Sequence, residues 1–279
     1  KPKDMMLMAI ISGFDTAYSA YNGFQNAIER FWTLRWLTQN GVTELDCAVM
    51  KDGLVRADTL PLVLRTKVAM GSGYGSQHLM DPAGIFATAP GWRIVAPSTA
   101  ADYVGLMNAA LALEDPVLVI EHLDLYQRAD RVPEGELDYI IPPCTAALRR
   151  EGSDATVISY LSMVHHCAEA LDQTGLDADL IDLRWLDRAS IDWDTIEASV
   201  KKTNAVVIVE QGARGTSYGG WLADEIQRRF FDWLDQPVQR VTGGEASPSI
   251  SKVLERAAIA RTEEVVTAFE ALKQNMGGN

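Results

Sequence analysis

Residues 154–210 read DATVISYLSMVHHCAEALDQTGLDADLIDLRWLDRASIDWDTIEASVKKTNAVVIVE, and this stretch decides the fold. It contains three short apolar runs rich in β-branched residues, at 154–161, 177–186 and 204–210, separated by two segments with helical periodicity. Strands that alternate with helices of this length are typical of βαβ units on a parallel sheet. The two helical segments end in QTG and KKTN, whose Gly and Asn suit a left-handed cap. The stretch therefore predicts an α/β fold.

The same alternation continues on both sides of this stretch. Apolar runs predict further strands at 59–70, 92–98, 116–122 and 236–242, and periodic segments predict helices at 24–41, 100–115, 217–235 and 262–275. Between the halves, residues 126–144 are charged and rich in proline, which is typical of a connector. We predict two domains, 1–140 with the connector from about 126, and 141–279. Each is expected to be a three-layer domain around a mostly parallel sheet.

Composition excludes several classes of protein. The 279 residues carry a formal net charge of -13, so the surface repels nucleic acid, and a basic protein module is a better partner. No run of eighteen apolar residues occurs, which argues against a membrane span. The three cysteines, Cys47, Cys144 and Cys167, are odd in number and widely spaced. Such cysteines indicate a reducing compartment, with the cytoplasm as the first expectation and an organelle interior left open.

The sequence GSGYGSQHLMDP at 71–82 places His78 after a glycine-rich exit from a predicted strand. In open parallel sheets, ligands bind at the carboxyl ends of strands, and glycines let a backbone approach a ligand closely. The spacing is neither a dinucleotide fingerprint nor a phosphate-binding P-loop. From these residues alone, a ligand-facing histidine and a solvated histidine on a surface loop remain equally favoured.

Other polar residues offer weaker candidates for a site. His165, His166 and Cys167 are adjacent on a predicted helix, so they point in different directions and do not suit a common metal ion. Glu210 at a strand end is either catalytic or a cap for the following helix, and we favour the cap. Glu121 and His122 end a strand, so they either reach the same rim as His78 or support it.

One long block of the sequence resembles a known family. The block GSQHLMDPAGIFATAPGWRIVAPSTAADYVGLMNAALALEDPVLVIEH, with LY at 125–126, resembles the beta subunit of the decarboxylating first component of 2-oxoacid dehydrogenase complexes. The later DLIDLRWLDRASIDWDTI and NAVVIVEQGA blocks agree in order, so the resemblance runs from about residue 60 to the C-terminus. These proteins are thiamine diphosphate enzymes of the transketolase superfamily. The resemblance implies a pyrimidine-binding-type first domain and a transketolase C-terminal-like second domain.

The resemblance also implies roles for individual residues. His78 matches the active-site histidine that faces the substrate and its intermediate in the family. Tyr18, and with less support Phe14, lie where the family supplies an aromatic side chain against the aminopyrimidine ring, although packing of an apolar helix face explains both equally well. The cofactor-activating glutamate of the family lies upstream of residue 1, so the first domain is expected to be incomplete at its N-terminus.

The implied cofactor is thiamine diphosphate with Mg²⁺, shared with an alpha-type chain that holds the diphosphate and the metal. No residue of this chain is assigned to the metal. The implied activity is oxidative decarboxylation of a 2-oxo acid and acyl transfer to a lipoyl domain, in an alpha2-beta2 assembly with a lipoyl acyltransferase core. Pyruvate, a branched-chain 2-oxo acid and acetoin remain open as substrates. The alternatives are a transketolase-type ketol transferase and a non-catalytic assembly module. Bacterial cytoplasm or an organelle matrix is the implied location.

Overall fold

The computed structural model describes residues 35, 37–39, 41, 47–49, 55–57, 60–89, 91–135, 137–215, 218–245 and 247–277. The chain forms two compact units, Lys1–Asp58 and Thr59–Asn279. In the first unit, the described strands β1 (Cys47–Val49) and β2 (Val55–Ala57) pair antiparallel. The second unit contains both larger sheets and the candidate site.

The first sheet of the larger unit is parallel, in the order β3 (Val63–Val68), β5 (Val117–His122), β4 (Arg93–Val95). Helix α4 (Ala100–Ala112) covers one face, where its apolar side chains pack on β4 and β5. Two single-turn helices, α2 (Ser76–Leu79) and α3 (Ala83–Phe86), lie between β3 and β4, and the 3-10 helix η2 (Leu123–Gln127) follows β5.

The second sheet has the order β10-β9-β7-β8-β6. Its strands are β6 (Ala147–Arg150), β7 (Ala155–Ser159), β8 (Ala178–Asp182), β9 (Val206–Ala213) and β10 (Gln239–Gly243). All neighbours are parallel except β6, which runs antiparallel to β8 at the edge.

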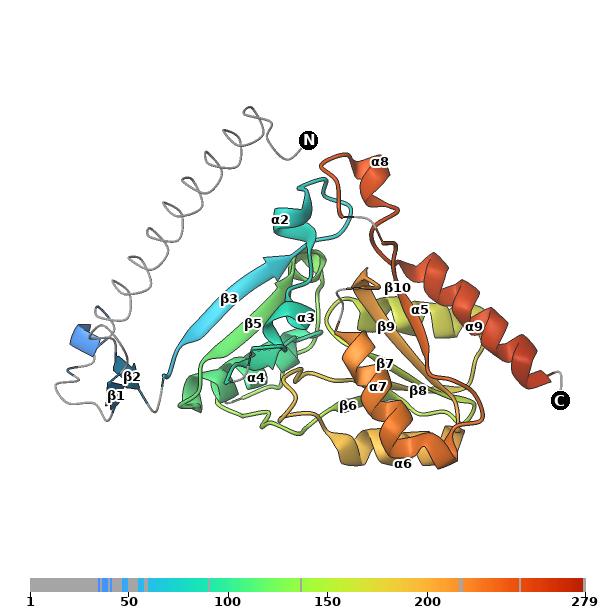
Figure 1. The fold of residues 1–279 in the computed structure, drawn as a ribbon, viewed down its shortest axis with the longest axis horizontal. Coiled ribbons are helices and arrows are strands. Elements are labelled where there is room, and N and C mark those ends of the chain that lie inside the picture. Colours follow the sequence, from blue (N-terminus) through green and yellow to red (C-terminus); the bar gives the residue numbers. More distant parts are fainter. Residues whose placement is uncertain are drawn as a thin grey trace, which may run out of the picture. The chain divides into compact units, whose positions relative to one another are not determined.

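Four helices cover the second sheet, two on each face (Figure 1). Helices α5 (Met163–Thr174) and α9 (Thr262–Gly277) pack together on one face, and α6 (Trp193–Thr203) and α7 (Gly219–Phe230) cover the other. The 3-10 helix η3 (Phe231–Trp233) follows α7, and the one-turn helix α8 (Lys252–Glu255) lies between β10 and α9. The second sheet is therefore the centre of a three-layer arrangement.

One hydrophobic core joins the two sheets. Side chains from the first sheet and its loops contact side chains from β7, β8, β9 and the helices α6 and α7 in a single buried cluster. From the first sheet it includes Val68, Ile94, Leu118 and Ile120, and from the second Ile158, Ile181, Ile208, Leu222 and Ile226. The face of the first sheet opposite α4 is thus closed by the second half of the same unit.

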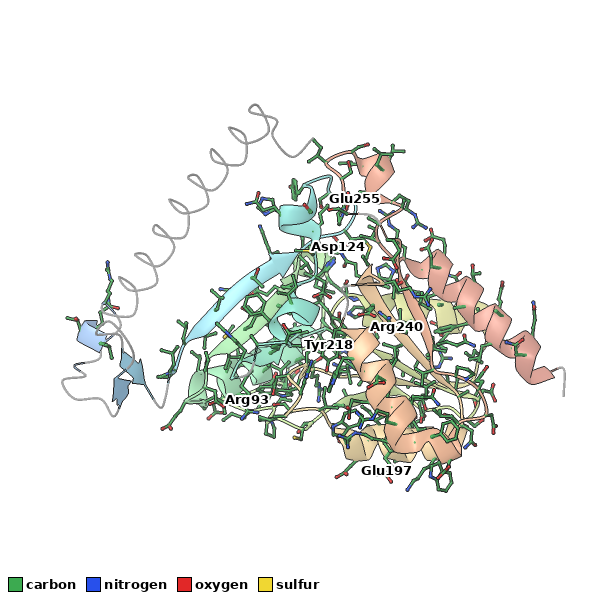
Figure 2. The ribbon with its side chains drawn as sticks, viewed as in Figure 1. Arg93, Asp124, Glu197, Tyr218, Arg240 and Glu255 are labelled. Carbon is green, nitrogen blue, oxygen red and sulfur yellow. The ribbon has the colours of Figure 1, made fainter. Side chains whose placement is uncertain are left out.

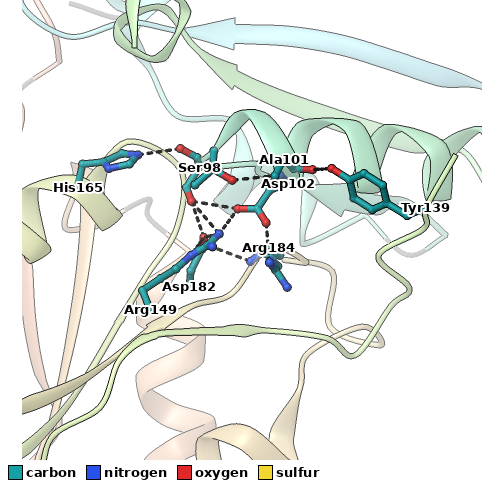
Figure 3. Close-up of polar contacts among 9 residues, drawn as sticks. Ser98, Ala101, Asp102, Tyr139, Arg149, His165, Asp182 and Arg184 are labelled. Atoms are coloured by element: carbon teal, nitrogen blue, oxygen red, sulfur yellow. Dashed lines mark hydrogen bonds and ion pairs between the residues drawn. The ribbon is translucent and has the colours of Figure 1, made fainter. Parts of the chain in front are cut away.

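A polar cluster between α4 and the second sheet adds to this junction (Figure 3). The buried Asp102 carboxylate accepts from Arg184 Nη2 at 2.6 Å and also pairs with Arg149. Arg149 Nη2 lies 2.8 Å from the buried Asp182, and Ser98 Oγ donates to Asp182 at 2.5 Å. Asp102 and Ser98 come from the first half, and the other three residues come from the second. These bonds therefore link the two halves.

The α/β class and the mostly parallel sheets that the sequence predicts are confirmed. The predicted left-handed caps are present, because Gly175 ends α5 at φ 62° and Asn204 ends α6 at φ 56°. The sequence analysis missed β6, a four-residue edge strand whose exposed Leu148 breaks the apolar pattern. The domain boundary near residue 140 stays a prediction. Among the described residues, no helix is long and apolar enough to cross a membrane.

Candidate active site

His78 lies in α2 with its side chain exposed, and its ring meets Tyr74 edge-on at a centroid distance of 6.2 Å. The next residue, Leu79, is buried with 1% of its surface exposed. The short helix is therefore fixed to the core by Leu79 while the imidazole faces outward. An exposed imidazole fits both a ligand-facing and a solvated histidine, so the role of His78 stays a prediction.

The glycines before His78 adopt a conformation that other residues rarely take. Gly71, Gly73 and Gly75 have φ values of 70°, 69° and 76°, which is the left-handed region where a Cβ is costly. A Cβ at Gly73 would also lie 2.8 Å from the carbonyl oxygen of Ile250. What approaches Gly73 and Gly75 closely is thus a segment of the same chain, the residues at the start of α8.

The loop backbone binds a buried carboxylate from α8. The Gly71 N–H donates to Glu255 Oε1 at 2.6 Å, and the Gly73 N–H donates to Glu255 Oε2 at 2.7 Å. Glu255, labelled beside α2 and α8 in Figure 2, has no exposed surface. Sequence reasoning missed this residue, because it lies 184 positions from Gly71 in a segment without a recognisable motif.

The carboxyl ends of strands from both sheets converge behind this loop. In the second sheet the chain passes from β7 to β8 on one side and then returns across β7 to β9, so the topological switch point lies between β7 and β9. Open α/β sheets bind ligands at such points. Gln211 at the end of β9 donates through Nε2 to the carbonyl oxygen of Ala69, which follows β3. The switch point of the second sheet therefore adjoins the start of the histidine loop.

His122, at the end of β5, contacts the end of β9. Its Nε2 lies 2.8 Å from Gln211 Oε1, and its Nδ1 accepts from the Asp124 N–H at 3.2 Å. The side chain is fully buried, and this burial lowers its pKa below the usual 6.5. A neutral imidazole with the proton on Nε2 satisfies both contacts. His122 thus connects β5 to β9.

Asp81, three residues after His78, anchors the other end of the loop. Its Oδ1 accepts from the Ala83 N–H at 2.9 Å, and its Oδ2 accepts from Tyr160 Oη at 2.6 Å. Burial raises the pKa of Asp81 above its usual value, and the bond from Tyr160 opposes that shift. Because Tyr160 follows β7, this contact ties the loop to the second sheet. Asp81 was missed in the sequence, where its position before Pro82 was the available signal.

Glu121 points to the other side of β5 from His122, because successive residues of a strand face opposite sides. It is nearly buried and accepts from Arg65 Nε at 2.5 Å, from Tyr103 Oη at 2.9 Å and from Tyr126 Oη. Burial alone would raise the pKa of Glu121, but the bonds from Arg65, Tyr126 and Tyr103 lower it. These residues line a cavity of about 520 Å³ between α4, β5 and the connector.

The neighbouring residues His165, His166 and Cys167 point to three different places. His165 Nε2 donates to the carbonyl oxygen of Ser98, His166 Nδ1 lies 2.7 Å from Thr262 Oγ1, and Cys167 is buried in the core beneath α5. Within the described part of the chain, no three His, Cys, Asp or Glu side chains are placed to hold a metal ion.

Glu210 acts as the cap that its position suggested. Its Oε2 accepts from the Gly219 N–H, the first of α7, at 2.8 Å, and Arg240 Nη2 lies 2.9 Å from Oε1. A negative charge at a helix N-terminus is stabilised by the unpaired N–H groups there. Tyr18 and Phe14, the candidates for the aminopyrimidine ring, lie outside the described residues.

Two family models match this chain, one over each of its two larger sheets. Residues 45–128 match the family model described as "Transketolase, pyrimidine binding domain", and residues 145–265 match "Transketolase, C-terminal domain". A solved structure titled "Split gene transketolase, inactive beta4 tetramer" superimposes with a TM-score of 0.59 at 20% identity, covering 77% of this chain and 67% of that one. At this identity the likeness shows the fold alone.

Curated relatives are more similar in sequence. The "Pyruvate dehydrogenase E1 component subunit beta" of Porphyra purpurea is 35% identical over 76% of this chain and 64% of its own length. The mitochondrial protein of that name from Dictyostelium discoideum is 33% identical, over 77% and 61%. Thus the chain spans less than two thirds of these two relatives. The mitochondrial subunit beta-1 of Arabidopsis thaliana is 31% identical over 90% of this chain and 70% of its own length. The chain therefore belongs to the family of pyruvate dehydrogenase E1 component beta subunits, which is built from transketolase pyrimidine-binding and C-terminal domains.

Proposed function

We propose that this chain is the beta-type subunit of a thiamine diphosphate-dependent 2-oxoacid dehydrogenase. The complete enzyme would decarboxylate a 2-oxo acid oxidatively and transfer the acyl group to a lipoyl domain. One structural observation carries the proposal: His78 is exposed on a loop anchored at both ends, beside the convergent carboxyl ends of β3, β5 and β9. The family of E1 beta subunits supports this reading over a transketolase-type ketol transferase.

In this proposal His78 is the catalytic residue of the described chain. An imidazole can both donate and accept a proton, and its exposure leaves its free ring nitrogen available to a bound 2-oxo acid. Thiamine diphosphate, when bound, supplies the electron sink for the loss of CO₂. His78 would orient the substrate carboxylate or carbonyl and move a proton there. Asp81 and Glu255 hold the loop, and His122 stays neutral and structural.

In this proposal the described residues contribute His78 and its loop to the site. Mg²⁺ prefers carboxylate and carbonyl oxygens in octahedral geometry, and the described residues offer no cluster of three or more side chains of this kind. We place the diphosphate and its Mg²⁺ on an alpha-type partner chain because the resemblance to E1 beta subunits implies it. Tyr18 and Phe14 remain our candidates for contact with the aminopyrimidine ring, with Tyr18 preferred.

The proposed assembly is an alpha2-beta2 heterotetramer that passes its product to a lipoyl acyltransferase core. Two of the relatives that bear the E1 beta name are described as mitochondrial. We propose a bacterial cytoplasm or an organelle matrix as the location. The identity of the 2-oxo acid depends on the partner chain as well as on this one.

The test is reconstitution. The complete protein would be purified with an alpha-type chain and examined by native mass spectrometry, then titrated with thiamine diphosphate and Mg²⁺ by calorimetry. We expect a heterotetramer that binds the cofactor and either decarboxylates pyruvate or a branched-chain 2-oxo acid or cleaves the central carbon–carbon bond of acetoin, while either chain alone does neither. A heterotetramer without cofactor affinity would contradict the proposal in favour of an assembly module. Ketol transfer between sugar phosphates would contradict it in favour of a transketolase.

A further inference from the structure

Glu255 is a charged residue in an unusual environment. Its carboxylate has no exposed surface, and in the described part of the chain it has no ion-pair partner. A buried carboxylate is costly unless hydrogen bonds replace its water. Here the Gly71 and Gly73 N–H groups do so, one to each oxygen, at 2.6 and 2.7 Å. The charge of Glu255 is therefore stabilised by the backbone of the histidine loop.

The loop has the shape that such an anion requires. Successive N–H groups around left-handed residues form a concavity that binds anions, and Gly71 and Gly73 are both left-handed. Ile250 lies so close to the loop that a larger residue would not fit at Gly73 or Gly75. A Cβ at Gly73 would lie 2.8 Å from Ile250 O, and one at Gly75 would lie 3.0 Å from Ile250 Cγ2. The segment 250–255 therefore fits against the loop at the level of the backbone.

We propose that Glu255 is a positioning residue: its carboxylate fixes the backbone of residues 71–75 and thereby the direction in which His78 is presented. The inference rests on the proposed function, because it matters for turnover only if His78 is catalytic. The physical path is short. Gly73 is only five residues from His78. The carbonyl oxygen of Gly75 accepts hydrogen bonds from the backbone N–H groups of His78 and Leu79, and the Leu79 side chain is buried. Glu255 thus binds the loop just before α2, and Leu79 packs the end of α2 into the core.

The primary test is Glu255→Gln in the complete protein. The amide keeps one acceptor oxygen but presents its NH₂ group to a backbone donor, so one charge-assisted bond is lost. Bonds to charged groups contribute an amount that corresponds to roughly 10- to 100-fold in an equilibrium. We expect the Gly71 and Gly73 amides to exchange with deuterium about 10- to 100-fold faster, measured by NMR or by mass spectrometry of peptides that span the loop.

The second readout is the imidazole of His78 itself. The chain has four histidines, so His78→Gln assigns its ring signal directly. In Glu255→Gln we expect that signal to shift or broaden, while the signals of His122, His165 and His166 stay in place. In the reconstituted enzyme we expect kcat to fall about tenfold and thiamine diphosphate affinity to stay within about twofold.

Asp192→Asn is the matched control. The Asp192 carboxylate also accepts two backbone N–H groups, from Thr195 and Ala146, at 3.0 Å each. It caps α6, at the opposite end of the second half from α8 (Figure 1). This variant should lose a comparable amount of stability and leave the loop exchange, the His78 signal and kcat unchanged.

A second variant covers the case in which Glu255→Gln does not fold. Gly73→Ala introduces a Cβ at φ 69° against Ile250 and should move the loop away from an intact Glu255. It should therefore reproduce the faster exchange of Gly71 and the altered His78 signal. Unchanged exchange and an unchanged His78 signal in either folded variant would overturn the proposal. Altered exchange with normal kcat would uphold the contact and instead contradict the proposed catalytic role of His78.

Discussion

Three residues anchor the loop that carries His78. Glu255 binds the loop before it, Asp81 binds the loop after it, and Leu79 lies in the core directly beside it. Each contact joins the loop to a different element, namely α8, the end of β7 and the hydrophobic interior. Residues that act in catalysis are held in place by such supporting contacts, because a small displacement of the reacting group costs much of the rate.

Replacing His78 separates catalysis from cofactor binding. In the reconstituted enzyme, His78→Ala should lower kcat by about 10²- to 10⁴-fold, the usual contribution of a general acid or base. Thiamine diphosphate affinity should change by less than about threefold, because the partner chain holds the diphosphate in our proposal. Steady-state kinetics and calorimetry measure the two effects. An equal loss of rate and affinity would contradict the role assigned to His78.

His165 should make stability depend on pH. Its half-buried ring donates to Ser98 O, and burial lowers its pKa below 6.5. The unfolded chain therefore binds a proton near pH 6.5 that the folded protein takes up only at lower pH, so stability falls as the pH drops below 6.5. His165→Gln keeps a donor for Ser98 and removes the titration.

Urea unfolding at pH 7.5, 6.5 and 5.5 tests this prediction. The native protein should lose stability between the last two values with a slope of at most about 1.4 kcal/mol per pH unit from this histidine. The variant should show a smaller slope. His122 and His166 also have pKa values lowered by burial, so a residual slope remains expected. Identical slopes would show that His165 does not titrate in this range.

At the scale of elements, α4 is fixed to the second sheet through Asp102. Its carboxylate lies between Arg149 on β6 and Arg184 after β8, as Figure 3 shows. Arg184 itself adopts a left-handed φ of 60°, which is uncommon for a residue with a Cβ. The surroundings of Asp102 therefore hold Arg184 in a conformation that it would not choose in a free chain.

Asp102→Asn should be strongly destabilising. Arg149 would keep its pair with Asp182, but Arg184 would lose the carboxylate that it pairs with, and removing one partner from a buried ion pair costs about 3 kcal/mol or more. The control is Glu197→Gln, which removes an exposed ion pair with Lys201 on α6. Exposed pairs of this kind contribute less than about 0.5 kcal/mol. Urea midpoints compare the two variants. A similar small effect of both would show that the cluster in Figure 3 does not stabilise the junction.

Elements and contacts differ in how far the sequence predicts them. Strands β7, β8 and β9 and helices α5 and α6 were predictable, because buried parallel strands are continuously apolar and helix ends carry their own caps. His78 was predictable as a candidate from its glycines and from the family resemblance. The partners of its loop were not, because a buried Glu255 leaves no local pattern and its contact spans most of the chain. Tyr18 and Phe14 stay predictions.

At the scale of the whole molecule, the formal charge of -13 affects how the protein meets its partners. We propose that a basic segment of the acyltransferase core binds to it, and charge complementarity of this kind acts mainly on the association rate. Raising the salt concentration from 50 to 200 mM should lower that rate about tenfold and change the dissociation rate little. Stopped-flow or surface-based binding kinetics would measure both. A rate insensitive to salt would contradict a charge-guided encounter.

The buried cluster that both sheets share has a consequence for inheritance. Val68, Leu118 and Ile120 on one sheet and Ile158 and Ile208 on the other are buried in the same cluster. A gene fragment that encoded either half alone would specify a protein with a wide apolar face open to water, and such faces favour aggregation. Recombination at this junction would therefore be selected against unless a compatible second half came with it, so the two halves should descend as one unit.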